Sequence, residues 1–149
     1  METKSYRKMA AMLAISFVIM YGVMFLNVYS AEHIYLSLTR TYMSLLMVSP
    51  MALLMLLFMP DMYKKKTWNL AIAACSVVVF IVALLFLRMQ VPIGDKQYMQ
   101  AMIPHHSSAI LTSSNANIKD PEVRALADGI IKTQKEEIAQ MKSILKRMK

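Results

Sequence analysis

The chain has 149 residues, of which 57% are apolar, and a formal net charge of +8. This composition excludes an ordinary soluble domain, because such domains are about 45–50% apolar. The single cysteine, Cys75, excludes an intramolecular disulfide, and we expect it to pack as a small hydrophobic side chain rather than to bind a metal.

Three apolar runs without a charged residue come first in the chain: residues 9–28, 42–59 and 69–87. Each run is close to the roughly 20 residues that a helix needs to cross about 30 Å of hydrocarbon. We therefore predict an all-α protein in which residues 1–91 form a membrane domain with three transmembrane helices. The first run is longer than the roughly 7–15 apolar residues of a signal peptide, so we expect an uncleaved anchor.

Basic residues flank these runs unevenly. Lys4, Arg7 and Lys8 precede the first run and Lys64–Lys66 precede the third, whereas Arg40 is the only basic residue between the first and second. This bias predicts a cytoplasmic N-terminus and an extracytoplasmic tail. The flanking charges also indicate the lipid bilayer as a partner. We expect no nucleic-acid binding, because the tail has no glycine-rich loop, aromatic platform or basic stripe.

The second run carries a methionine at every fourth position, and Pro50 lies in its middle. The methionines are Met43, Met47, Met51, Met55 and Met59. They could form a thioether ladder for soft cations, or they could fill contacts between helices. We favour packing, because no polar partner shares their face. Pro50 predicts a kink, since it removes one backbone hydrogen bond and its ring clashes with the preceding turn.

Residues 92–149 are predicted to form an extracytoplasmic hairpin of two helices. Pro92 and Gly94 break the chain, and Asp95 is the expected N-cap of a helix that reaches about Ser114. Residues 113–117 are the expected turn.

The second hairpin helix is expected to start at Asp120, with Pro121 in its first position, and to run to about Met148. Its predicted seam alternates steps of three and four: Val123, Ala127, Ile130, Gln134, Ile138, Met141, Leu145 and Met148. A hairpin of this size cannot bury much core alone. We therefore expect a homodimer or higher homo-oligomer, in which two hairpins make a four-helix bundle.

Metal-binding side chains gather on the first hairpin helix. Met99, Met102 and His106 share its inward face, and Met102 and His106 are one turn apart, so both can reach one ion. His105 is rotated by about 100° from His106, so it joins them only if the helix deforms near Pro104 or another chain contributes. Imidazole with thioether is a soft ligand set that suits Cu(I).

The facing helix offers two further candidates. Met141 would add a thioether, and Glu137 would either bind the metal or hydrogen-bond the far nitrogen of a ligating histidine. His33, in the short outward loop, could extend the site. Zinc fits less well, because it prefers cysteine, histidine and carboxylate ligands. The alternative is that the histidines are satisfied structural residues and the methionines are core residues.

These residues resemble a known family. The motif Met102-x-x-His105-His106-x-x-Ala109-Ile110, preceded by Asp95 and followed by Gln134-x-x-Glu137-Ile138-x-x-Met141, resembles the bacterial ferritin-like "domain of unknown function 305" family over about residues 95–149. The three preceding helices resemble its membrane-attached subgroup. At Thr112 the chain departs from the family, which often has another methionine there.

The resemblance implies a ferritin-like half-bundle and an extracytoplasmic copper-binding role in copper tolerance. It implies ligand roles for Met102, His105, His106 and Met141, with Asp95 and Glu137 as supporting polar positions.

Two functions are therefore in view. The first is a bacterial inner-membrane protein whose periplasmic hairpin binds Cu(I) or Ag(I) for buffering, delivery or tolerance. The second is a non-catalytic membrane assembly protein with structural histidines. We expect no enzymatic activity, because no Ser/His/acid or Cys/His set is present and the acids are too few for a di-iron site.

Overall fold

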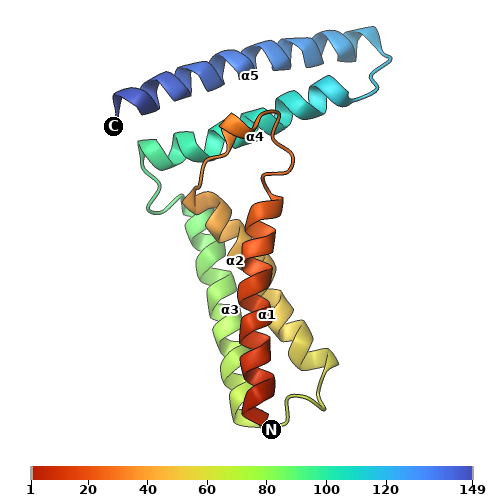
Figure 1. Ribbon diagram of the computed structural model, residues 1–149, viewed down its shortest axis with the longest axis vertical. Helices are drawn as coiled ribbons and strands as arrows, with labels where there is room; N and C mark the ends of the chain where they lie inside the picture. Colours follow the sequence, from red (N-terminus) through yellow and green to blue (C-terminus); the bar gives the residue numbers. More distant parts are fainter. Residues whose placement is uncertain (1, 149) are drawn as a thin grey trace. The chain divides into compact units, whose positions relative to one another are not determined.

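The computed structural model describes residues 2–148, which form α-helices and one short 3-10 helix and contain no β-strand (Figure 1). The elements are α1 (Glu2–Val23), η1 (Ala31–His33), α2 (Leu38–Phe58), α3 (Lys66–Met89), α4 (Asp95–Asn115) and α5 (Pro121–Arg147). They divide into two compact units. Unit 1 comprises Met1–Val23 with Thr39–Pro92, and unit 2 comprises Met24–Leu38 with Ile93–Lys149. The all-α prediction is confirmed.

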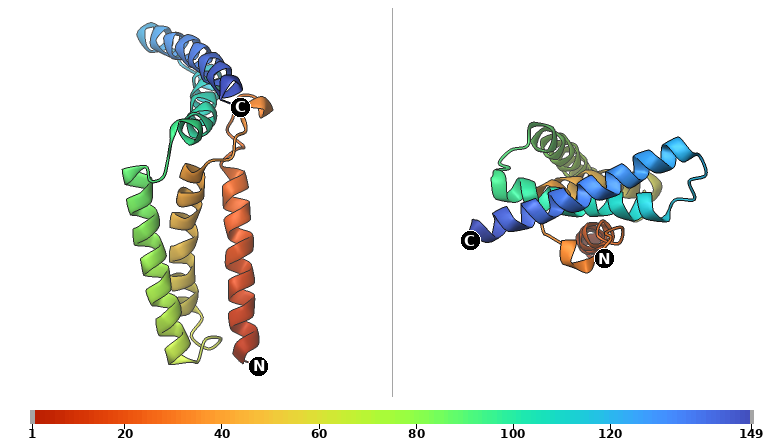
Figure 2. Two further views of the ribbon diagram at one scale, coloured as in Figure 1. Left: turned by 90° about the vertical axis from the view of Figure 1, so that its left-hand side faces the viewer. Right: turned by 90° about the horizontal axis from the view of Figure 1, so that it is seen from above.

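Unit 1 contains three helices that are long and apolar enough to cross a membrane, and they run side by side (Figure 2). The candidate spans are Thr3–Val23, Leu38–Phe58 and Lys66–Met89, one for each predicted run. Each helix begins a few residues before its apolar run and includes the basic residues that directly precede it: Lys4, Arg7 and Lys8 in α1, Arg40 in α2 and Lys66 in α3.

The first helix ends earlier than its apolar run. We expected it to reach residue 28, but α1 ends at Val23 and the next residues form turns. Asn27 and Tyr29 hydrogen-bond to α4 instead. Tertiary contacts therefore override the local apolar pattern at this end.

Hydrogen bonds tie the start of α1 to the start of α3. The Tyr6 hydroxyl donates to Asn69 Oδ1 at 2.7 Å, and the Lys65 backbone N–H donates to the Tyr6 oxygen at 3.1 Å. Asn69 Nδ2 in turn donates to the Tyr63 carbonyl at 2.7 Å. Tyr6, Met9 and Tyr63 are buried together there. A buried polar network of this kind holds the helix ends in one register.

Two expectations for the spanning helices need correction. Met43 and Met47 are 43% and 40% exposed, so they are only partly packed within the chain, whereas Met55 packs as expected against the cluster of Tyr6, Met9 and Tyr63. Cys75 is also exposed rather than packed, because α3 buries its Ser76 and Ala83 side. Helix α2 continues through Pro50 as one helix.

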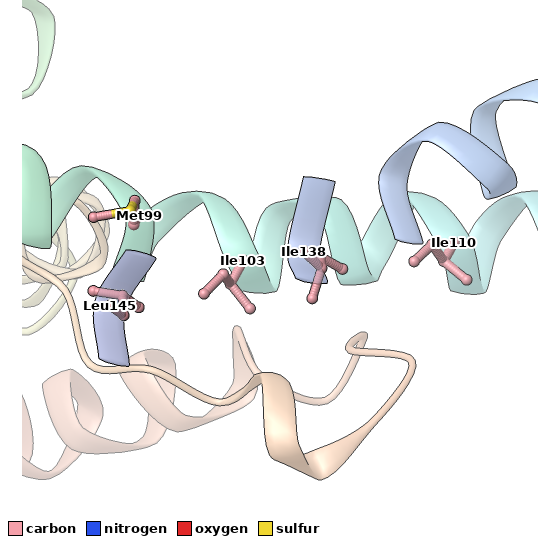
Figure 3. Close-up of a cluster of buried hydrophobic side chains, with 5 residues drawn as sticks. All are labelled: Met99, Ile103, Ile110, Ile138 and Leu145. Atoms are coloured by element: carbon pink, nitrogen blue, oxygen red, sulfur yellow. The ribbon is translucent and has the colours of Figure 1, made fainter. Parts of the chain in front are cut away.

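In unit 2, α4 and α5 pack as an antiparallel pair. Their buried core consists of Met99, Ile103 and Ile110 from α4 with Ile138 and Leu145 from α5 (Figure 3). Ile103 and Ile110 are almost completely buried, which makes this face of α4 the centre of the unit.

The hairpin ends where the sequence predicts, with small differences. Asp120 is confirmed as the N-cap of α5, since its Oδ1 accepts hydrogen bonds from the N–H groups of Glu122 and Val123 at 2.9 and 3.0 Å. Asp95 is not a cap but the first residue of α4, and Gly94 is the N-cap. Helix α4 also continues to Asn115, so the expected turn at residues 113–117 starts three residues too early.

The seam predicted for α5 is wrong in part. Ala127, Ile138 and Leu145 are buried as expected, but Val123 and Ile130 are 49% and 37% exposed. Met148 is exposed as well, and Ile131 and Ile144 pack against the core instead. The reason is the helical period: Ala127 and Leu145 lie about five full turns of 3.6 residues apart, whereas the prediction assumed a 3.5-residue repeat.

The loop Met24–Leu38 belongs to unit 2, although we expected it to be part of the membrane domain. Ser107 is fully buried, and its oxygen accepts from the Tyr29 N–H at 2.8 Å and lies 2.8 Å from His33 Nδ1. Asn27 Nδ2 donates to Ser108 Oγ at 2.8 Å, and the Leu38 N–H donates to the Gln97 side-chain oxygen at 3.0 Å. The loop is thus fastened along α4.

Candidate metal centre

An open cleft of about 570 Å³ lies between α4 and α5. We call it the His106 cleft. Its lining includes six of the predicted site residues: Asp95, Met99, Met102, His106, Glu137 and Met141. Six of the eight predicted residues therefore line one cleft, and two predicted histidines, His105 and His33, lie elsewhere.

Four residues form two facing pairs in this cleft. His106 Nε2 lies 2.8 Å from Glu137 Oε2. Met102 precedes His106 by one turn on α4, and Met141 follows Glu137 by one turn on α5. Because the helices are antiparallel, these two steps lead to the same level. The cleft thus presents an imidazole–carboxylate pair next to a pair of thioethers.

The backbone fixes the orientation of the His106 ring. Its Nδ1 lies 2.8 Å from the Met102 carbonyl oxygen, which can only accept, so Nδ1 carries a proton and donates it. Nε2 is then the nitrogen directed at the cleft. One of the two roles expected of Glu137, a hydrogen bond to the far nitrogen, is therefore filled by the Met102 carbonyl. Glu137 contacts the nitrogen that would bind a metal.

Glu137 is itself held in place by Gln134, whose Nε2 donates to the same carboxylate oxygen at 3.4 Å. Among residues 2–148 no three His, Cys, Asp or Glu side chains come close enough to hold a metal. A metal in the His106 cleft would therefore depend on thioether sulfur, which selects soft ions.

The structure does not bring His105 into the cleft. Its side chain is exposed, and its ring is edge-on to that of His106 with centroids 6.1 Å apart. Helix α4 continues through Pro104, so the rotation of about 100° between neighbouring residues is retained. Asp95 lies eleven residues before His106, about 16 Å along the axis, too far to share an ion with it.

His33 lies in a separate, smaller pocket with Tyr29, Ile110 and Lys142. Burial lowers the pKa of His33 below its ordinary value, the positive charge of Lys142 lowers it further, and Glu32 opposes the shift. The Nδ1 of His33 lies within hydrogen-bond distance of the Ser107 hydroxyl, at 2.8 Å. His33 therefore fastens the loop rather than extending the cleft.

Sequence reasoning missed other lining residues of α5: Gln140, Ile144, Arg147 and Met148. Most lie three, four or seven residues beyond Glu137 or Met141, so continuing the helical period from those two positions would have found them.

Comparison with known proteins identifies the family. The family model described as "Domain of unknown function (DUF305)" matches residues 87–149, which include α4 and α5. An uncharacterized protein of Acanthamoeba polyphaga mimivirus is 38% identical over 118 residues, which cover 78% of this chain and 76% of that protein. The chain belongs to the DUF305 family. The viral match is longer than the tail after Pro92, so the similarity to that protein extends into the apolar helices. No solved structure matches the chain.

Proposed function

We propose that this protein is a membrane-anchored Cu(I)- and Ag(I)-binding protein that buffers or delivers the metal, or confers tolerance to it. The proposal rests on one observation: Met102 on α4 and Met141 on α5 line the same cleft at the same height along the two helices, beside His106. Two thioethers and one imidazole nitrogen in one cleft form a donor set that suits Cu(I), whereas zinc would prefer thiolate and carboxylate.

In this proposal His106 Nε2, Met102 and Met141 hold the ion, and Glu137 places a negative charge beside it. Met99 is 6% exposed and part of the hydrophobic core, so its contribution would be secondary. The Nδ1–H bond to the Met102 carbonyl fixes the tautomer that a metal at Nε2 requires.

We further propose that the protein resides in the inner membrane of a bacterium. Its N-terminus would be cytoplasmic, and unit 2 would lie on the extracytoplasmic side. The orientation follows the basic residues Lys4, Arg7, Lys8 and Lys64–Lys66. Hydrogen bonds between the loop Met24–Leu38 and α4 agree with three crossings, because both segments must be on the same side of a membrane. Helices α2 and α3 separate them along the chain, so two crossings return the chain to that side. Alkaline phosphatase fused to the C-terminus should be active, and fused after Lys66 inactive. The reverse pattern would refute the orientation.

The oligomer is a second part of the proposal. Val123, Leu126 and Ile130 are 49%, 66% and 37% exposed and follow i, i+3, i+7 spacing on α5. We call them the apolar stripe. A second hairpin packed on the apolar stripe would complete a ferritin-like four-helix bundle.

One observation favours the alternative, a non-catalytic assembly protein with structural histidines. Both ring nitrogens of His106 already have protein partners, as in a histidine that only satisfies neighbouring polar groups. Neither proposal assigns a catalytic role to the chain.

Anaerobic titration with Cu(I) against a chromophoric chelator tests the proposal. The full chain in mild detergent is the correct sample, because the loop Met24–Leu38 is part of unit 2 and would be missing from an isolated tail. We expect one Cu(I) bound per chain, and Ag(I) should compete for it. A chain that leaves all Cu(I) on the chelator would refute the copper proposal and favour the assembly function.

A further inference from the structure

Unit 2 contains a second groove, of about 410 Å³, outside the His106 cleft. Three lysines line it together with one acid, two hydrogen-bonding side chains and one apolar residue: Lys96, Lys142, Lys146, Glu32, Tyr35, Gln100 and Leu145. We call it the basic groove. Nothing in the copper proposal uses it.

The basic groove has an excess of positive charge. Lys142 Nζ lies 3.3 Å from Glu32 Oε2, and this pair joins α5 to the loop. Among residues 2–148, neither Lys96 nor Lys146 forms an ion pair. The lining therefore includes two lysines that no carboxylate of the described residues pairs with.

The other lining groups suit a phosphate. Ammonium groups bind phosphate oxygens as point charges, and the Tyr35 hydroxyl and Gln100 amide add neutral hydrogen-bond donors. Tyr35 also packs against the hydrophobic core, so its ring is held in place. The buried Leu145 gives the groove an apolar floor on which a lipid glycerol could rest.

Short connections tie the basic groove to membrane-spanning helices. Tyr35 lies three residues before Leu38, the first residue of α2, and an extended segment of that length spans only about 10 Å. Lys96 lies seven residues after Met89, the last residue of α3, a reach of at most about 25 Å. The headgroup region of one leaflet and its counterion layer are together about 15 Å deep. The reach from α2 to Tyr35 lies within this depth, and the reach from α3 to Lys96 is an upper limit that a folded connection does not attain.

We propose that the basic groove binds the phosphate group of an anionic phospholipid. A soluble phosphate shares this chemistry, but the short connections favour the lipid. The inference rests on membrane anchoring and not on metal binding.

Lipid selectivity of the full chain in detergent tests the proposal. Spin-labelled phosphatidylglycerol and spin-labelled phosphatidylcholine would each be added to mixed micelles that contain the protein. The measured quantity is the fraction of each lipid whose motion is restricted by contact with the protein. The test variant is Lys96→Gln with Lys146→Gln. The matched control is Lys119→Gln with Lys132→Gln, which removes the same charge from exposed positions of unit 2 outside the groove. Circular dichroism verifies that both variants stay helical.

We expect the test variant to lose most of its selectivity for phosphatidylglycerol over phosphatidylcholine, because each lysine should contribute a factor of about five to that selectivity. The control variant should keep it. Equal losses in both variants would overturn the proposal, because the preference would then reflect overall charge. Competition by millimolar inorganic phosphate, at an ionic strength matched with chloride, would also overturn it, since the occupant would then be a soluble anion.

Discussion

His106 Nε2 lies 2.8 Å from Glu137 Oε2, and a proton must lie between these two atoms. Whichever residue carries that proton, a metal ion at Nε2 has to displace it, because Nδ1 already donates to the Met102 carbonyl. The carboxylate therefore holds the ring in position and competes with the metal for the same nitrogen.

This competition predicts that Cu(I) binding releases a proton. The release would be measured with a pH indicator in weakly buffered solution during anaerobic titration. Glu137→Gln removes the carboxylate but keeps a hydrogen-bonding amide, so proton release should be smaller in that variant. If both proteins released the same amount, the shared proton would not be the one that the metal displaces.

Met102→Leu should lower the Cu(I) affinity by about ten-fold or more, a loss of about 1.4 kcal/mol in binding free energy. Leucine keeps the volume and apolarity of methionine, and such exchanges typically cost a fold less than about 1.5 kcal/mol. The measurement is a chelator competition. Met12→Leu, at a half-exposed position of α1, is the control. An unchanged affinity in Met102→Leu would remove Met102 from the ligand set.

The two neighbouring histidines should behave differently. His106→Ala removes the nitrogen in the cleft and should weaken Cu(I) binding by an order of magnitude or more. His105→Ala should change the affinity by less than about two-fold, because its ring lies outside the cleft. An equal loss in both variants would mean that His105 reaches the ion from a second copy or after a local change in α4.

The pH dependence of unit 2 should include a contribution from His33. Its pKa in the folded chain is lowered by burial and by Lys142, so the fold prefers the neutral ring. As the pH falls through about 6.5, the unfolded chain takes up the proton first, and the folded state loses stability down to the lowered pKa. Above about 6.5 this contribution is fully present.

His33→Asn isolates this effect, because the amide group can still hydrogen-bond to the Ser107 hydroxyl but does not titrate. The thermal midpoint of the wild type should fall further between about pH 8 and pH 5.5 than that of the variant. Parallel curves for the two proteins would show that His33 does not contribute.

The apolar stripe should mediate self-association. Ile130→Lys would place an unpaired charge in the contact between copies and should raise the dissociation constant by about ten-fold or more. Ala125→Lys is the matched control, since it is exposed about 140° away around α5. Light scattering in mild detergent would report the mass. A wild type that is monomeric at every concentration would contradict the oligomer proposal.

Local sequence signals predicted much of the fold. The apolar runs gave the three long helices, and Asp120 with Pro121 gave the start of α5, because side-chain capping acts within three residues. The i, i+4 spacing of Met102 with His106, and of Glu137 with Met141, placed both pairs on facing sides before the helices were paired.

The remaining features depend on contacts between distant residues. No pattern near Asn27 or His33 indicates that they bond to Ser108 and Ser107, which are 81 and 74 residues away. Ile131 rather than Ile130 packs against the core, because this depends on how α5 lies on α4. The predicted seam instead assumed the 3.5-residue repeat of a coiled coil. The partner of His106 Nδ1 is a backbone carbonyl, which no side-chain motif records.

The bonds from the loop to Ser107 impose an order on the synthesis of this protein. Tyr29 leaves the ribosome 78 residues before Ser107, so in the proposed three-crossing topology its N–H has no partner on α4 until α2 and α3 have been inserted. If α2 or α3 failed to cross, the loop and α4 would be stranded on opposite sides, and Ser107 would be deprived of its partners. The hydrogen bonds between the loop and α4 therefore form only in a correctly inserted chain. In a misinserted chain the loop would stay unpaired, and a quality-control protease could recognise it.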